Sequence, residues 1–298
     1  MDQNILFAII SPFFSSIATI FQSVALKTLS PLIVVSFSAL IGSLIIFSIV
    51  LISREKINFR KLRRNSGDLI YMALLRPLFG AVMFSFGLSM TTAIKAIFFT
   101  KMEPYFVLGW NWILHKEKIQ LNQAILLLIH VMGAIILSTG GALESFGKTQ
   151  IGDLLIIISM GFFSLSYVYG SRLSKNVGAK LTNAIILGIA GVILLPFAFL
   201  FLPSTTILTN PTGWIYLLAN VIFFNVIGLT LWIASLKSVK GWMVSALRSL
   251  GPIIGAPVAW LLLGETLSQI QIVGAVIVLI TSVLIAREHN PKSSANKK

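Results

Sequence analysis

The chain has 298 residues, of which 56% are hydrophobic and only 11% are charged, and its mean hydropathy is +0.93. Since a soluble domain usually carries about 25% charged residues, this composition excludes a water-soluble fold. The formal net charge is +14, and the chain contains no Cys, which excludes disulfides and thiolate metal sites.

Apolar segments of membrane-spanning length recur along the whole chain. A span needs about 20 mostly apolar residues, because a helix rises about 1.5 Å per residue across about 30 Å of hydrocarbon. The first segment lacks a basic leader and a cleavage site, so we expect a retained span rather than a signal peptide. The sequence therefore predicts an all-α polytopic membrane protein with ten transmembrane helices, at residues 5–26, 32–53, 68–90, 93–114, 121–140, 151–173, 181–202, 213–236, 241–263 and 268–286.

Basic residues alternate between the connections that join these spans. The connections after spans two, four, six and eight and the chain end after span ten hold 17 Lys and Arg, whereas the other connections hold only Lys27, Lys95 and Lys148. The positive-inside rule then places both termini in the cytoplasm of a multi-pass protein of the cell membrane. Because most of the positive charge is an orientation signal that faces anionic lipid, we expect no nucleic-acid partner.

The chain also repeats itself. Residues 94–119 align without a gap to residues 242–267 at an offset of 148, which pairs Pro104 with Pro252 and Glu117 with Glu265. Each copy holds five spans, and because five is odd the second copy enters the membrane the opposite way up. We therefore expect two inverted five-helix repeats, at 1–148 and 149–288, followed by a polar cytoplasmic tail at 289–298.

Short segments recur in the same order near the ends of both copies. They are Phe86-Gly87-Leu88, Glu103-Pro104 and the Glu117 turn in the first copy, and 231–236, Gly251-Pro252, 264–267 and Val273-Gly274-Ala275 in the second. This duplicated order resembles the EamA family of the drug/metabolite transporter superfamily, over essentially the whole chain. The resemblance implies that spans one to four and six to nine surround a substrate path and that spans five and ten are peripheral. The first copy departs from the pattern, with His115-Lys116 in place of Leu263-Gly264.

Four charged residues near the middle of predicted spans are candidates for the site: Arg76, Lys101, Glu103 and Arg248. A charge at the bilayer centre costs about 2.5 to 3.5 kcal/mol on insertion scales, so each should be paired, hydrated or functional. Counting about 1.5 Å per residue from the span ends places all four within roughly 6 Å of one depth, near the midplane. The alternative is that they snorkel or tie helices together.

The angular positions of these residues around their helices limit which of them can face one cavity. At about 100° per residue, Lys101 and Glu103 lie about 200° apart and cannot face the same cavity directly. We expect Glu103 and Arg248 to face a central cavity from opposite copies and to pair when it is empty, leaving Arg76 or Lys101 for an anionic substrate group. The layer sums to +2, which favours a carboxylate or phosphate over a cation.

Three prolines next to this layer, Pro77, Pro104 and Pro252, predict hinges, because proline removes the hydrogen bond to the carbonyl four residues earlier. A simple packing kink is the open alternative.

Other residues complete the expected site. Tyr167, Asn225 and Trp232 are further candidates for the cavity wall, with ordinary interhelical contacts as the alternative. Glu117 and Glu265 occupy equivalent turns, where we expect them to cap or seal rather than to catalyse.

The sequence thus predicts a secondary transporter that moves a small polar or amphipathic metabolite, such as an amino acid or organic anion, by alternating access. Export is the direction that the family resemblance suggests. The chain holds no Walker motif, so we expect no direct use of ATP, and we expect no metal, no cofactor and no enzyme activity.

Several alternatives stay open. A nucleotide-sugar or multidrug carrier of the same fold is the main rival. An intramembrane enzyme would need clustered His, Asp or Glu, whereas the three His stand apart at 115, 130 and 289. A non-transporting membrane scaffold is the remaining alternative. Proton coupling through Glu103 and assembly as a homodimer are also left open.

Overall fold

The computed structural model describes residues 3–55, 57–115, 121–140, 148–200, 211–239 and 241–288. The predicted Glu117 turn and the predicted tail at 289–298 lie outside these residues. Every regular element in the described part of the chain is helical. The elements are α1 (Gln3–Ala25), α2 (Pro31–Ile52), α3 (Phe59–Arg64), α4 (Ser66–Ala73), η1 (Leu74–Gly80), α5 (Ala81–Leu88), α6 (Ala93–Phe99), η2 (Thr100–Met102), α7 (Glu103–His115), α8 (Leu121–Thr139), α9 (Lys148–Asn176), α10 (Ala179–Leu200), α11 (Pro211–Asn220), η4 (Val221–Gly228), α12 (Leu229–Ser235), α13 (Gly241–Leu247), η5 (Arg248–Leu250), α14 (Gly251–Leu263) and α15 (Gln269–Glu288).

Six helical runs within the described residues are long and apolar enough to cross a membrane. Two of them pass through several elements: Ser66–Leu88 joins α4, η1 and α5, and Pro211–Ser235 joins α11, η4 and α12. The expected all-α membrane fold is therefore confirmed, while the count of ten spans stays a prediction. The other four membrane-length runs are Gln3–Ala25, Pro31–Ile52, Thr149–Asn176 and Ala179–Leu200.

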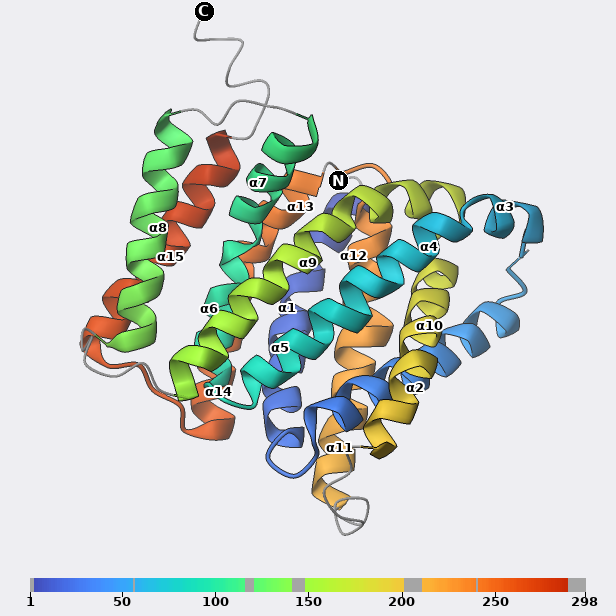
Figure 1. Cartoon of the computed structure of the whole chain (residues 1–298), viewed down its shortest axis with the longest axis horizontal. Helices are drawn as coiled ribbons and strands as arrows, with labels where there is room; N and C mark the ends of the chain where they lie inside the picture. The colour runs from blue at the N-terminus through green and yellow to red at the C-terminus, as the bar shows by residue number, and fades with distance from the viewer. Residues whose placement is uncertain are drawn as a thin grey trace, which may run out of the picture.

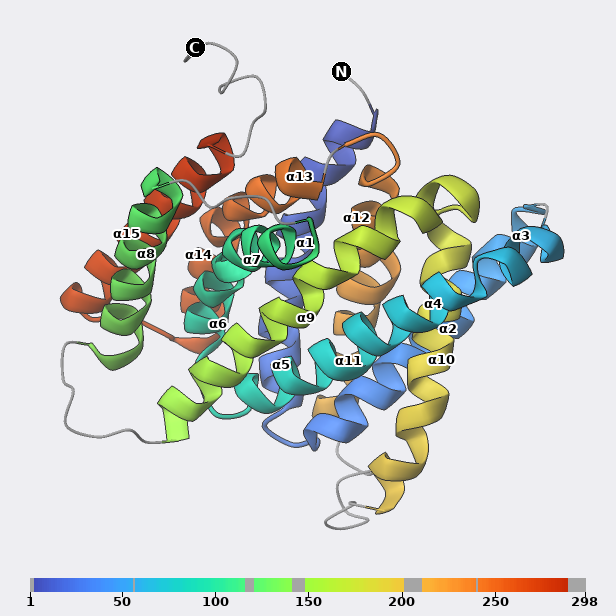
Figure 2. The same cartoon turned by 45° about the horizontal axis from the view of Figure 1, so that its top comes forward.

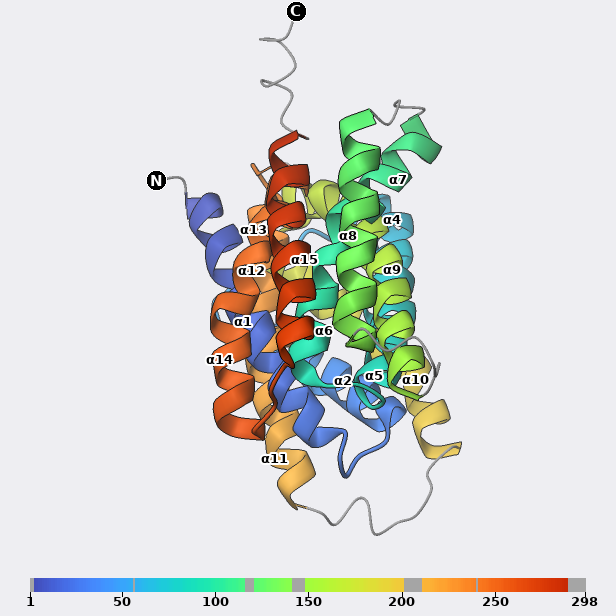
Figure 3. The ribbon, with the colours of Figure 1, turned by 90° about the vertical axis from the view of Figure 1, so that its left-hand side faces the viewer.

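The helices form one bundle with α1 through its middle (Figures 1 and 2), where it contacts α11, η4, α12 and α14. α2 packs along α10, and α5 packs along α9. The antiparallel pair of α8 and α15 lies at one edge of the bundle (Figure 1). α1 begins and α15 ends on the same side of the bundle (Figures 1 and 3), so two ends distant in sequence share one face of the helical layer.

Local sequence explains where several helices begin and end. α2 starts where Ser30 accepts a hydrogen bond from the Ile33 amide and Pro31 occupies the first turn, a favoured combination at a helix start. α14 ends at Gly264, whose φ of 64° is the left-handed conformation that a residue without a Cβ adopts at low cost. That turn directs the chain across the outside of the bundle into α15.

Within the described residues, four helical segments depart from α-helical winding, and three of them contain or precede a predicted hinge proline. Pro77 lies inside the π-helical η1, while the 3₁₀ turns η2 and η5 come just before Pro104 and Pro252. A proline cannot donate to the carbonyl four residues earlier, so the helix rewinds locally around it. The sequence thus located these breaks, whereas the hinge role of the prolines stays a prediction.

The fourth irregular segment, η4, contains no proline. Two of its carbonyls accept hydrogen bonds from side chains of other helices: Asn183 donates to the Asn225 carbonyl at 2.6 Å, and the Ser11 hydroxyl donates to the Gly228 carbonyl at 2.9 Å. Inserted polar groups of this kind are a known cause of local unwinding. Because the donors come from distant parts of the chain, no local sequence pattern predicts η4.

Candidate functional site

A cavity lies between helices of both sequence halves. α1 contributes the stretch from Pro12 to Gln22, away from its start, and α2 contributes the stretch from Val34 to Ala39, near its start. Since the α1–α2 turn is on the face opposite to the start of α1, the cavity occupies the half of the layer next to that turn. The other half is closed.

Buried apolar side chains close the half of the bundle next to the start of α1. Most of them come from α4, α9, α10, α12 and the residues just after α12, with single contributions from α1 and α13 and two from α2, and they form one hydrophobic cluster. Within it the Tyr167 ring packs edge-on against Trp232, with ring centroids 4.9 Å apart. The cavity therefore lies in the half of the layer next to the α1–α2 turn, and its charged residues lie at the end nearest to this cluster.

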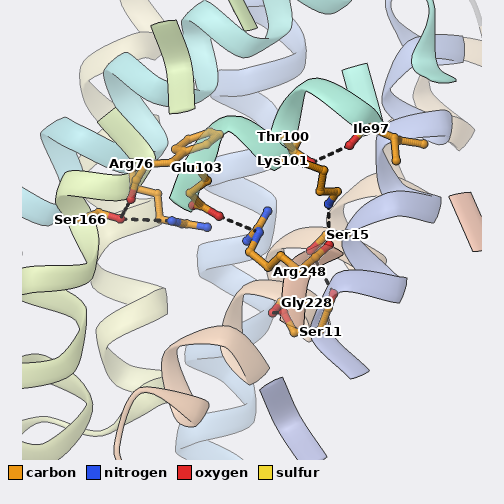
Figure 4. A network of polar contacts seen from close by, with 11 residues as sticks. Ser11, Ser15, Arg76, Ile97, Thr100, Lys101, Glu103, Ser166, Gly228 and Arg248 are labelled. Carbon is orange, nitrogen blue, oxygen red and sulfur yellow. Dashed lines mark hydrogen bonds and ion pairs between the residues drawn. The ribbon is translucent and has the colours of Figure 1, made fainter. Parts of the chain in front are cut away.

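Glu103 and Arg248 form an ion pair between the two sequence halves. Arg248 Nε lies 2.9 Å from Glu103 Oε2, with Glu103 fully buried and Arg248 only 7% exposed (Figure 4). The contact lacks hydrogen-bond geometry, and neither carboxylate oxygen has a hydrogen-bond partner among the described residues. The opposite charge of Arg248 is thus the main compensation for a carboxylate in an apolar environment.

Only one partner of the ion pair lines the cavity. Arg248 lines the cavity, as does Lys101, whereas Glu103 lies behind the wall. We expected Glu103 and Arg248 to face the cavity and Arg76 or Lys101 to stay available to a substrate; the residues that line the described cavity include Lys101 but not Glu103. Sequence separation gave the angle between the two side chains but not which of them points inward, and the tighter winding of η2 rotates the residues after it.

Lys101 donates a hydrogen bond to the backbone carbonyl that Pro252 leaves without an amide donor. Its Nζ donates to the Arg248 carbonyl at 2.5 Å, the carbonyl that would receive the missing amide of Pro252 in a regular helix. Lys101 is 3% exposed, so this donor and acceptor meet away from bulk water. A side chain of the first copy thereby stabilises the unwound η5 turn of the second.

Arg76 is held by aromatic rings and one hydroxyl. Its Cζ lies 3.7 Å from the centroid of the Trp232 ring and 5.0 Å from that of Phe163, and its Nη1 donates to Ser166 Oγ at 3.1 Å. Such cation–π contacts stabilise a cation most where it is desolvated. Arg76 reaches the cavity wall, while its Nε makes no hydrogen bond among the described residues.

Three predicted wall residues occupy different positions. Asn225 lines the cavity and donates to the Ser38 carbonyl at 2.8 Å. Trp232 and Tyr167 are absent from the described cavity wall and form a layer behind it, with Trp232 stacked on Arg76. Their large rings belong to the apolar cluster of the closed half instead.

The sequence reasoning missed a row of hydroxyls on α1. Ser15, Ser16 and Thr19 line the cavity, and Ser15 and Thr19 each donate to the carbonyl four residues earlier at 3.0 Å. Their protons are therefore used within α1, which leaves hydroxyl oxygens as acceptors toward the cavity. The signal was present as small hydroxyl residues at a spacing of four, which lie on one helix face.

No group of three His, Asp or Glu side chains that could hold a metal ion occurs within the described residues. The cavity instead combines three cationic side chains at one end with hydroxyl and amide groups along its wall. Apolar residues such as Val34, Phe84 and Ile97 form the rest of that wall. This arrangement suits a small ligand with an anionic group and an apolar part.

Comparison with known proteins gives a consistent picture. An uncharacterized transporter of Methanothermobacter thermautotrophicus is 24% identical over 285 residues, which cover 91% of this chain and 82% of that protein. A Salmonella typhimurium protein named "Probable amino-acid metabolite efflux pump" is 21% identical over 185 residues, which cover 59% of this chain and 62% of that protein.

The fold is also shared with a solved structure described as "Crystal structure of protein". Its TM-score is 0.67 at 15% identity, and the match covers 95% of this chain and 98% of that one, which at such low identity shows the fold alone. The model of the EamA-like transporter family matches residues 3–139 and 150–287. Because the two segments matched by the family model cover almost the whole sequence, the chain belongs to the EamA-like transporter family.

Proposed function

We propose that this protein is a secondary carrier, without catalytic activity, that moves a small organic anion or zwitterion such as an amino acid across the cell membrane by alternating access. The observation that carries the proposal is the one-sided cavity whose closed end holds Arg76, Lys101 and Arg248. A cavity confined to one half of the layer, with packed apolar side chains in the other half, is what a carrier has in one of its two end states.

The charge balance supports an anionic substrate group. The only carboxylate of the midplane layer, Glu103, is already paired with Arg248 behind the cavity wall. The layer of Arg76, Lys101, Glu103 and Arg248 therefore keeps a formal charge of +2. A carboxylate or phosphate would gain from this field in a low-dielectric site, whereas a cationic drug would be repelled.

The alternating-access part of the proposal includes two inverted five-helix repeats, and the matching positions of the irregular segments support it. The 3₁₀ turns η2 and η5 begin 148 residues apart, at Thr100 and Arg248, and the π segments η1 and η4 begin at Leu74 and Val221. The helical runs 93–115, 121–139, 241–263 and 269–288 would bring the six membrane-length runs to ten spans. Copies that exchange unequal conformations would move the opening from one face to the other.

The direction of the opening follows from the basic residues. If the basic connections face the cytoplasm, then the start of α1 and the end of α15 are cytoplasmic and the cavity opens outward. Export then requires an inward-open state that loads substrate and this outward-open state that releases it. The name of the Salmonella relative supports both an amino-acid substrate and this direction.

The test is flux of radiolabelled amino acids and organic anions in proteoliposomes that contain the full chain. We expect uptake of at least one anionic or zwitterionic compound, and a loss of at least tenfold in Arg248→Ala. Lys180→Gln, which removes an exposed ion pair with Glu55, is the matched control and should keep the unmodified rate. Runs with and without a pH gradient, on the unmodified protein and on Glu103→Gln, determine whether Glu103 couples transport to protons.

Two outcomes would contradict the proposal. One is flux of cationic dyes with none of any anion or zwitterion, which would favour the multidrug alternative. The other is an unchanged substrate rate in both Glu103→Gln and Arg248→Ala, which would show that the charged layer has no part in transport.

A further inference from the structure

We propose that α3 is an interfacial helix that binds the headgroup of an anionic glycerophospholipid on the face where α2 ends and α4 begins. This goes beyond transport, since it assigns a lipid site to a surface that takes no part in the cavity.

The two neighbouring spans place α3 at the membrane surface. α2 ends at Ile52 and the next membrane-length run begins at Ser66, so the segment between them lies where hydrocarbon meets water. Arg54 makes the turn with a left-handed φ of 50°, and its amide donates to the Leu51 carbonyl at 3.0 Å. The chain therefore leaves α2 sharply, and α3 extends beyond α10 at the edge of the bundle (Figure 1).

The two faces of α3 differ in chemistry. At about 100° per residue, Phe59 and Leu62 fall on one side, whereas Arg60 and Arg64 fall on the other. Leu62 is partly buried against the closed-half cluster, but Phe59 is 76% exposed. An exposed aromatic ring beside exposed cations is the composition of a helix that lies in the membrane interface.

Among the described residues, the cations of α3 make no ion pair. Arg60, Lys61, Arg63 and Arg64 are exposed, and none of them forms an ion pair within the part of the chain that the structure describes. Glu55, the acidic residue just before them, forms an ion pair with Lys180, with Lys180 Nζ 2.5 Å from Glu55 Oε1. This leaves a cluster of four cations that a phosphate-bearing headgroup complements.

The cluster is held in a defined orientation. Asn58 caps the start of α3 by accepting from the Lys61 amide at 3.0 Å. At its end, Asn176 of α9 donates to Asn65 Oδ1 at 2.9 Å, which fixes the α3–α4 junction on the end of α9. A bound headgroup thus meets a preformed surface rather than a flexible loop.

Native mass spectrometry of the purified full-length protein with phosphatidylglycerol or phosphatidylcholine tests the proposal. We expect the unmodified protein to retain at least threefold more phosphatidylglycerol than phosphatidylcholine. Arg60→Gln/Arg64→Gln should abolish this preference, and Phe59→Ser should weaken retention of both lipids. The matched control is Arg172→Gln/Lys175→Gln, which removes two exposed cations at the end of α9 on the same face and should keep the preference.

Equal retention of the two lipids by the unmodified protein would overturn the proposal. So would an equal loss in the control variant, because binding would then follow net charge rather than α3. An unchanged melting temperature of each variant in neutral lipid shows that the comparison is between folded proteins. The readout needs no transported substrate, so it stands apart from the test of transport.

Discussion

At the scale of single residues, the buried ion pair between Glu103 and Arg248 has the largest expected effect on stability. Removing one partner of a buried pair leaves an unpaired charge and typically costs about 3 to 5 kcal/mol. We therefore expect Arg248→Ala to lower the melting temperature much more than Lys180→Gln, whose pair with Glu55 is exposed and worth about 0 to 1 kcal/mol. Thermal unfolding in detergent measures the difference.

A double-mutant cycle separates the pair from its surroundings. Arg248→Ala combined with Glu103→Gln should cost less than the sum of the single changes, because the second change removes the charge that the first left unpaired. Strict additivity would mean that the two side chains do not interact, despite their 2.9 Å separation.

Lys101 offers a second prediction, which concerns the missing amide of Pro252. In Lys101→Met, the buried Arg248 carbonyl loses its donor, at a cost of about 1 to 3 kcal/mol. Pro252→Ala restores an amide four residues after Arg248, so Lys101→Met should cost less in that background. If the cost is the same in both backgrounds, Lys101 acts through its charge and not through the carbonyl.

At the scale of elements, Glu265 joins the second half of the chain to the first. Its two carboxylate oxygens accept from the amides of Ala93 and Ile94, at 3.0 and 2.8 Å, at the start of α6. The sequence predicted a capping or sealing role for this turn residue, and the structure confirms capping while adding a helix from the other half as the partner. A carboxylate at a helix start is stabilised by both the free amides and the helix dipole.

We expect Glu265→Ala to lower the free energy of unfolding by about 1 to 2 kcal/mol, and Glu265→Gln by less, because the amide keeps one acceptor oxygen but loses the charge. Denaturant unfolding of both variants provides the measurement. Equal effects of the two substitutions would show that the charge is not involved, and no effect of either would mean that solvent caps α6 equally well.

The sequence predicted elements where the cause was local. Apolar length marked the helical segments, and prolines marked the irregular turns near Lys101 and Arg248 as well as η1. It could not predict η4, since the side chains that bond its carbonyls come from α1 and α10. Nor could it place Trp232 over Arg76, because a helix that is apolar on nearly every side gives no periodic signal for which face is inside.

At the scale of the whole molecule, the site also has features that follow from local sequence and features that depend on contacts between distant segments. The depth of Arg76, Lys101, Glu103 and Arg248 could be counted from span ends, and the structure brings all four to the closed end of the cavity. Which of them faces the cavity depends on helix rotation and on packing between halves. The hydroxyl row of α1 was overlooked because single Ser and Thr residues are common in membrane helices and carry no charge to attract attention.

The one-sided cavity predicts an asymmetric labelling pattern, and the absence of Cys makes it measurable with single introduced thiols. Gln22→Cys lies in the cavity wall, whereas Leu173→Cys replaces a fully buried residue of the closed half. A membrane-impermeant maleimide added outside intact cells should label the first rapidly and the second hardly at all. Val192→Cys, on an apolar exposed surface, is the control for a lipid-facing thiol and should also stay unlabelled. Labelling of Gln22→Cys only from the cytoplasmic side would reverse the assigned orientation, and equal rates at Gln22→Cys and Leu173→Cys would show that the closed half is not a barrier.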